Sequence, residues 1–182
     1  MKTNSLSVCL ILLVSAFLCL SSAVSADTNA ELSALTLRGL TKVYVEVDGI
    51  HRDFDKFGLN AEQLKSQIET TLNANGLVVT SQQALLNDAN VARLRIKINA
   101  NENQYRFYHY GVKLELAQKI PTNKNGGYIA ETTWTNGQTG VIMPMELRRL
   151  GVYAKELVGV FLKDFHSQNP KVAGQTPLNS RL

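Results

Sequence analysis

The chain has 182 residues, of which 45% are hydrophobic and 19% are charged. That is enough apolar sequence for one globular domain with a buried core, and it excludes a disordered or fibrous chain. Lys and Arg number 19 against 15 Asp and Glu, giving a net charge of +4. Because this charge is small and spread along the chain, we expect no nucleic-acid partner.

The first 26 residues have the form of a secretory signal. Lys2 precedes an apolar run from Leu6 to Leu20, and the small residues Val24-Ser25-Ala26 follow it. The run is shorter than the roughly 20 residues that a helix needs to span a bilayer. We therefore expect cleavage after Ala26, a periplasmic or secreted location, and no transmembrane span in the remaining chain. An uncleaved membrane anchor is the alternative.

Both cysteines, Cys9 and Cys19, lie in this N-terminal segment. Its removal would leave no thiol, which excludes disulfides, thiolate catalysis and cysteine-based zinc sites. Cys19 also stands where a lipid-modified cysteine could stand, but Leu18 occupies a position where lipoprotein processing prefers a small residue. We expect an exported chain without a lipid anchor.

The remaining chain is expected to be a single α/β domain over residues 41–168, with a weakly helical lead-in at 27–40 and a disordered tail at 169–182. Residues 42–48 alternate apolar and polar side chains, which predicts a strand that buries Val43, Val45 and Val47. Asn60 to Gln63 has the form of a helix-capping box. Apolar residues every four positions predict the following helix, and Gly76 fits its C-terminal cap. Residues 77–80 predict a second strand.

After a short helical turn at residues 82–87, three alternating strands are predicted without intervening helices. They cover residues 93–98, 107–118 and 128–135, the last with Ala130, Thr132 and Trp134 facing inward, and they should form an antiparallel meander. A long amphipathic helix at 146–166 should bury one apolar face: Leu147, Leu150, Ala154, Leu157, Val158, Phe161 and Phe165. The predicted fold is an α+β two-layer sandwich, a mostly antiparallel sheet with two helices packed on one face.

The segment from His51 to Asp55 places an imidazole and two carboxylates close together after a strand end. Such a group could bind a metal or act in acid-base catalysis, but a second contributing segment is missing, so a solvated turn is the expected state. The sequence contains no phosphate-binding glycine loop, nucleophile elbow or zinc-helix motif. We therefore expect no catalytic residue, no metal and no cofactor, and a protein that is not an enzyme.

A row of cations, Arg93, Arg95 and Lys97, should lie on the outer face of one strand, with Lys113 and Lys119 on the outer face of the next. Aligned cations could contact an anionic glycolipid or glycan. However, Glu46, Glu115 and Glu131 occupy outer positions of the same sheet. Cross-strand ion pairing is the more common outcome of such a pattern.

An apolar run lies within residues 136–145, between the last predicted strand and the last helix. Its candidate contact residues are Val141, Ile142, Met143 and Met145. If exposed, they would form a docking patch for a partner. If buried, they would close one end of the core. Both alternatives stay open at the level of sequence.

The order of elements behind an export signal resembles that of uncharacterised exported bacterial envelope proteins. The likeness is carried by Leu37-Arg38-Gly39 with the strand to Val47, the helix 61–75, and the segments 94–98, 130–134 and 147–165. In plan the chain is similar to lipopolysaccharide-assembly lipoproteins, and to modules of curli-secretion and penicillin-binding-protein activator lipoproteins.

This resemblance implies a noncatalytic periplasmic or envelope accessory protein that binds a partner protein or an envelope glycolipid. The alternative is a small-ligand or lipid-binding protein that uses a pocket between the sheet and the two helices.

Overall fold

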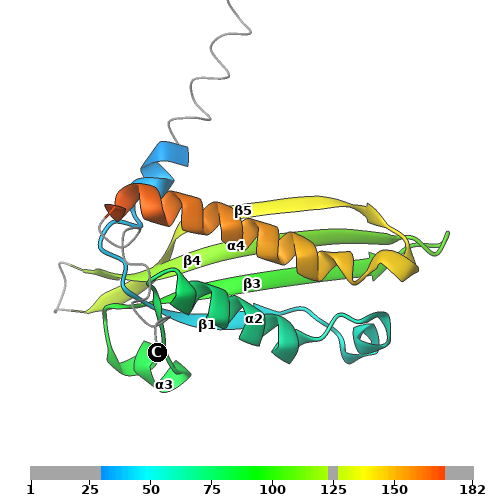
Figure 1. Cartoon of the computed structure of the whole chain (residues 1–182), viewed down its shortest axis with the longest axis horizontal. Coiled ribbons are helices and arrows are strands. Elements are labelled where there is room, and N and C mark those ends of the chain that lie inside the picture. Colours follow the sequence, from blue (N-terminus) through cyan, green and yellow to red (C-terminus); the bar gives the residue numbers. More distant parts are fainter. Residues whose placement is uncertain (1–29, 123–126, 171–182) are drawn as a thin grey trace, which may run out of the picture.

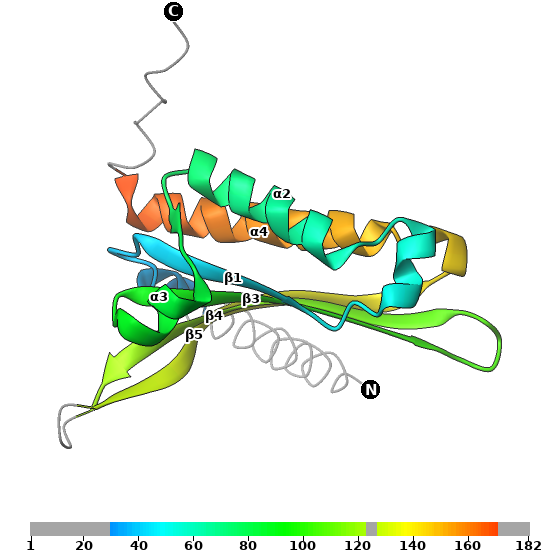
Figure 2. The same cartoon turned by 90° about the horizontal axis from the view of Figure 1, so that it is seen from below.

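A five-stranded sheet in the order β2-β1-β3-β4-β5 forms one layer of the structure, a computed structural model in which residues 30–122 and 127–170 are described. Two helices, α2 (Ala61–Ala74) and α4 (Arg149–Gln168), form the second layer. Figures 1 and 2 show both helices on the same face of the sheet. The α+β class is thereby confirmed.

The strands are short at one edge and long at the other. They are β1 (Lys42–Asp48), β2 (Val78–Val79), β3 (Val91–Glu102), β4 (Tyr108–Pro121) and β5 (Tyr128–Ile142). The short helix α3 (Gln82–Asn87) and the 3-10 turns η1 (Arg52–Phe57) and η2 (Pro144–Glu146) connect them. Residues 30–35 form a lead-in helix before β1.

The sheet is mixed, and its antiparallel ladders are longer than its parallel ones, in line with the prediction of a mostly antiparallel sheet. β1 runs parallel to both β2 and β3, whereas β3, β4 and β5 form the predicted antiparallel meander. The parallel pairs arise because the connections through α2 and α3 return the chain to the end of the sheet where β1 begins. β2 and β3 therefore both start at that end, on opposite sides of β1.

The core lies between the sheet and the two helices. Alternate residues of the strands point into it, as the period-two pattern predicted. The fully buried strand residues include Val43, Val45, Leu94, Ile96, Ile98, Leu114 and Leu116. All seven apolar positions predicted for the last helix are buried, but α4 begins at Arg149 and not at Glu146. Leu147 is therefore buried just before the helix, and the other six are buried on α4 together with Leu162.

Helix α2 begins and ends as its sequence predicted. The Asn60 side chain accepts a hydrogen bond from the Gln63 backbone N–H at 2.9 Å, which satisfies one free donor of the first turn. Leu64, Ile68 and Leu72 are buried. Gly76 follows the helix with φ of +86°, a left-handed conformation that ends helices at low cost in glycine.

Strand β5 departs from the prediction in two ways. It continues to Ile142 instead of ending at Thr135, because its whole length pairs with the long strand β4. A β-bulge opposite Leu116 and Ala117 also shifts the alternation, so that Trp134 is buried while Ala130 and Thr132 are exposed. The segment 136–142, expected to be irregular, is thus part of the sheet.

The lead-in is fastened at two points. The hydroxyls of Ser33 and Thr36 donate to the Thr133 carbonyl of β5, at 3.1 and 3.3 Å. Asn169, after α4, accepts from the Gly39 N–H at 2.8 Å and donates to the Leu37 carbonyl at 2.9 Å. Asn169 was expected to begin a disordered tail, and it is instead a bonded residue. Residues 1–29 and 171–182, with the predicted signal and most of the predicted tail, lie outside the described residues.

Gly49 separates β1 from η1 and offers a stability test. Its φ is +84°, and an added Cβ would lie 2.2 Å from the Ile98 carbonyl oxygen. Gly39 has a similar φ of +77° with nothing within 4 Å of its Cβ position. We expect Gly39→Ala to lower the free energy of unfolding by about 1–2 kcal/mol, which is the cost of the left-handed backbone conformation for a residue with a Cβ atom. Gly49→Ala should lower it by several kcal/mol more in urea denaturation. Equal losses in the two variants would contradict the backbone contact.

Candidate functional site

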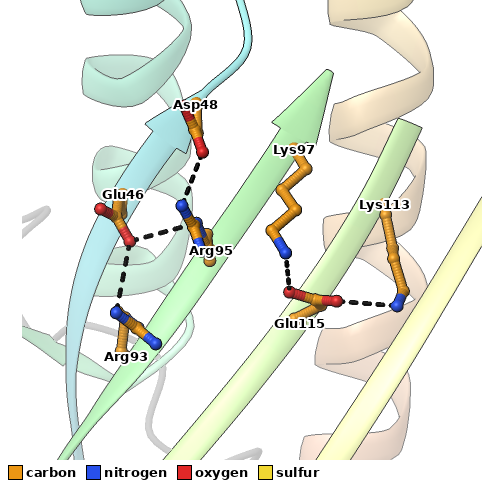
Figure 3. A network of polar contacts seen from close by, with 7 residues as sticks. All are labelled: Glu46, Asp48, Arg93, Arg95, Lys97, Lys113 and Glu115. Carbon is orange, nitrogen blue, oxygen red and sulfur yellow. Dashed lines mark hydrogen bonds and ion pairs between the residues drawn. The ribbon is translucent and has the colours of Figure 1, made fainter. Parts of the chain in front are cut away.

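The outer face of the sheet carries a network of ion pairs across β1, β3 and β4 (Figure 3). Arg95 contacts Asp48 at 2.6 Å and Glu46 at 3.4 Å, and Arg93 contacts Glu46 at 3.9 Å. The cross-strand pairing that the sequence favoured is therefore present. Of the acidic residues expected there, Glu46 and Glu115 take part, and Asp48 joins them.

Glu115 is the most enclosed carboxylate of this network. Its two oxygens accept separately from Lys113 at 2.7 Å and from Lys97 at 2.9 Å. Lys97 and Lys113 lie directly opposite each other in the β3–β4 register, so Glu115 offsets the repulsion between two like charges. Hydrogen bonds from Lys113 and then Lys97 hold the pKa of Glu115 below its usual value, against the opposing effect of partial burial.

The candidate anion contact residues, Arg93, Arg95 and Lys97, are all partners in this network. An anionic ligand would have to compete with carboxylates that are already in place. The network contains four cations and three carboxylates, so its net charge is +1 (4 − 3). The network itself is therefore close to electrically neutral.

Lys119, predicted on the same outer face, takes no part in the ion pairs described for this network. Its ammonium group donates to the backbone carbonyls of Leu85 and Asp88, at the end of α3. A cation at the C-terminal end of a helix satisfies carbonyl groups that have no partner inside the helix. Lys119 thus fastens α3 to β4.

The loop after β1 lies beside a hollow of about 490 Å³. β1 ends opposite Lys97, so the last part of β3 has a neighbouring strand on one side only. The hollow occupies this free side. Its lining includes polar groups and aromatic rings: His51, Lys56, Asn99, Asn101 and Glu102, with Phe54, Phe57 and Tyr108.

Whether His51, Asp53 and Asp55 come together stays a prediction, because one of the three side chains lies outside the described residues. Asp55 accepts a hydrogen bond from the Asn60 amide at 3.1 Å, and the side chain of Asp53 is outside the description. Within the described ranges, no group of three His, Cys, Asp or Glu residues could hold an ion. His109 and His166 each contact an asparagine side chain elsewhere, at 3.3 and 3.2 Å.

The apolar candidates at the end of β5 divide into two kinds. Ile142 is 4% exposed and belongs to the core, whereas Val141, Met143 and Met145 are 57%, 53% and 84% exposed. Phe107 and Tyr105, in the β3–β4 turn, are also exposed. In the β4–β5 register His109 lies opposite Val141, which brings this turn beside the end of β5.

These five exposed side chains are named the distal patch: Tyr105, Phe107, Val141, Met143 and Met145. Val141, Met143 and Met145 were predicted from the sequence. Tyr105 and Phe107 were not, because their position beside β5 depends on the register between β4 and β5. The order of strands β3, β4 and β5 was the available signal, because consecutive antiparallel strands bring each turn beside the end of the next strand.

No pocket of the expected kind is found between the sheet and the helices among the described hollows. Other hollows lie beside the start of β1, on the outer side of the α2–α4 contact, and on the outer face around Gly111 and Gly137. The space beneath the helices is filled by core side chains such as Phe161 and Leu114. In the described ranges, no helix has both the length and the apolar character to cross a membrane.

Comparisons with known proteins give structural neighbours at low similarity. A scan of protein-family models finds no match, and a search of curated protein sequences finds no significant one. A minor lipoprotein from Acinetobacter baumannii gives a TM-score of 0.38 at 14% identity, covering 72% of this chain and 95% of that one.

Two further solved structures are similar at the same level. The PelC dodecamer from Paraburkholderia phytofirmans gives a TM-score of 0.38 at 18% identity, covering 70% of this chain and 88% of its own. A neuraminyllactose-binding hemagglutinin homologue from Helicobacter pylori gives 0.39 at 13%, covering 75% and 91%. At these scores the neighbours carry no inference about function, and the expected likeness to lipopolysaccharide-assembly and curli-secretion proteins stays a prediction.

Glu115 allows a pH-dependent test of the network. Because its pKa is lower in the folded state, its stabilising contribution is present above the unfolded pKa and is lost as the pH falls through the folded pKa. We expect Glu115→Gln to lower the free energy of unfolding by about 1–2 kcal/mol at pH 7. This difference should shrink below about pH 4.

The measurement is urea denaturation of both proteins from pH 7 down to pH 3. Glu156→Gln is the matched control, since Glu156 is exposed on α4 and no ion pair of the described residues includes it. A Glu115→Gln deficit that persists unchanged at pH 3 would show that the carboxylate charge is not its cause.

Proposed function

We propose that the chain is a noncatalytic accessory protein of the bacterial envelope, periplasmic or secreted, that binds a partner protein through the distal patch. The observation that carries this proposal is the exposure of Met143 and Met145 just after the end of β5, which lies beside the turn that holds Phe107. Large apolar side chains grouped at one end of a sheet are unfavourable in water and are typical of interaction sites. Methionine adapts its shape to a partner surface at little cost.

The state of the charged residues favours a protein partner over a glycolipid. The cations that would contact an anionic headgroup are bound to Glu46, Asp48 and Glu115. An incoming anion would gain little from cations that are already paired, and solvent screens exposed charges. A partner protein that binds the distal patch would not have to break any ion pair of this network.

The sequence of the first 26 residues supports the proposed location. A short basic start, an apolar run and small residues before a cleavage point are the features of exported chains. The confinement of both cysteines to this segment agrees with it, because the rest of the chain then folds without thiol chemistry.

A second candidate is the binding of a small polar ligand in the hollow beside η1. The hollow combines three aromatic rings with amide, carboxylate and ammonium groups, a mixture that pockets use to fix the orientation of small ligands. If the hollow is the binding site, Asn101→Ala and Lys56→Ala would abolish binding of the small ligand, while substitutions in the distal patch would leave that binding unchanged.

The distal patch is tested with the double variant Met143→Ser/Met145→Ser. Both side chains are exposed, so the melting temperature should change little, while partner capture from envelope extracts should fall at least about tenfold. Quantitative mass spectrometry of proteins cross-linked to the wild type and to the variant provides the measurement.

Two controls separate docking from folding. Leu86→Ser removes an equally exposed apolar side chain from α3 and should leave partner capture unchanged. Ile142→Ser, in the core, should instead lower the free energy of unfolding by about 2–4 kcal/mol. Identical sets of cross-linked proteins from the wild type and the double methionine variant would rule out docking through the patch.

A further inference from the structure

Strand β5 forms an edge of the sheet, and the described residues cover only part of that edge. β5 pairs with β4 alone in the described sheet. The lead-in helix lies against the first part of β5, where the hydroxyls of Ser33 and Thr36 donate to the Thr133 carbonyl. Figure 1 shows this helix close to the C-terminal end of α4, away from the end of β5 that leads into η2. In the ranges that the structure describes, the edge from Trp134 onward is therefore the open part.

The open part lacks the features by which proteins usually protect an edge strand. The segment 134–142 reads Trp-Thr-Asn-Gly-Gln-Thr-Gly-Val-Ile, without a charged residue or a proline. Charges, prolines and bulges normally prevent edge-to-edge pairing, and the bulge of β5 precedes this segment. An uncovered edge of this length can form a new ladder with another strand.

The sequence of this edge is nearly symmetric about Gly137. In an antiparallel pair with a two-fold axis there, Thr135 would lie opposite Thr139 and Asn136 opposite Gln138. Trp134 would lie opposite Gly140, so that the largest side chain of the segment faces the smallest. Threonine thus meets threonine, an amide side chain meets another amide, and no equal charges are brought together. Threonine pairs and amide pairs are favourable across neighbouring strands.

The backbone supports the same register. The Gly137 N–H donates to the side-chain oxygen of Asn136 at 2.7 Å, a bond within its own strand. This N–H is satisfied by a local side chain, which indicates that Gly137 directs its backbone groups away from β4. Alternate residues of an antiparallel strand share one direction, so Thr135 and Thr139 direct theirs to the open edge as well. A two-fold axis at Gly137 places these three positions opposite one another as hydrogen-bonded pairs.

We propose that β5 pairs with β5 of a second copy of this chain, antiparallel and with the two-fold axis at Gly137. The two sheets then form one continuous sheet with all four long helices on the same face. The near-symmetric, uncharged sequence selects a second copy over an unrelated strand, because a different partner would find no charge on this edge to recognise.

Apolar side chains at the two ends of the ladder add to this pairing. Leu32 and Leu35 of the lead-in are 57% and 53% exposed, next to the covered Thr133 end. Antiparallel pairing brings this end of one copy beside Val141 of the other. Exposed apolar side chains that lie apart within a single copy, Leu32 and Leu35 on one side and Val141 on the other, thereby come together between the two copies. Met143, Met145 and Phe107 lie beyond the paired segment, so this inference does not depend on the proposed function.

The register is tested by mixing two single-cysteine proteins in a background with Cys9→Ser and Cys19→Ser. Thr135→Cys and Thr139→Cys are both on the exposed outer face. In the proposed pair, residue 135 of one copy lies opposite residue 139 of the other, at a separation that permits a disulfide. Residue 135 lies about 13 Å from residue 135 of the second copy, which forbids one.

Under mild oxidation, disulfide-linked dimers should therefore form in the mixture and not in either protein alone. Equal cross-linking in the mixture and in the separate samples would overturn the register, and no cross-linking in any sample would overturn the pairing. Patch variants such as Met143→Ser/Met145→Ser should cross-link normally in this background, which distinguishes failure of this inference from failure of the proposed function.

Charge substitutions at the same two positions give an independent measurement. Thr135→Lys/Thr139→Lys places lysine opposite lysine twice and should weaken dimer formation by roughly tenfold in sedimentation equilibrium. Thr135→Lys/Thr139→Glu places lysine opposite glutamate and should restore it. Melting temperatures verify that both variants fold. Equal dimer formation by the two variants would overturn the proposed pairing.

Discussion

The burial of alternate side chains from β3 and β4 beneath α4 is the interaction on which the rest of the structure depends. Leu94, Ile96, Leu114 and Leu116 are fully enclosed, and Phe161 packs over them from the helix layer. Because side chains of a strand alternate strictly, every residue between these positions is forced to the other face. The outer face is thus determined by the core: its residues are those that the core leaves out.

This constraint explains why the charged network exists where it does. Arg93, Arg95 and Lys97 stand between the buried residues of β3, and Glu115 stands between those of β4. Two lysines are consequently brought opposite each other, and Glu115 lies on the same face to accept from both. Trp134 shows the same logic at the edge, where its ring contacts Phe161 inside and its N–H donates to Asp164 at 2.9 Å.

Local features and the meander of consecutive strands could be predicted, whereas pairing between segments far apart in the sequence could not. The cap at Asn60, the buried stripe of α4 and the alternation of β3 are each encoded within a few residues. The parallel β1–β3 pair joins segments more than forty residues apart, and no local pattern reports it. The segment 136–142 is rich in glycine and amide residues, which are typical of turns, and only the long partner strand β4 makes it a strand.

The same distinction applies to the candidate sites. The pairing of Arg95 with Glu46 followed from outer-face alternation, whereas the role of Lys119 depended on where α3 lies. The symmetry of Thr135-Asn136-Gly137-Gln138-Thr139 is visible in the sequence, but it acquires meaning only when β5 is known to be an uncovered edge. The lead-in covers the edge of β5 as far as Thr133. The symmetric segment begins two residues later, at Thr135. The boundary between a protected and an unprotected edge therefore coincides with the boundary of the self-complementary sequence, which is the arrangement expected if the open half of β5 is kept for pairing.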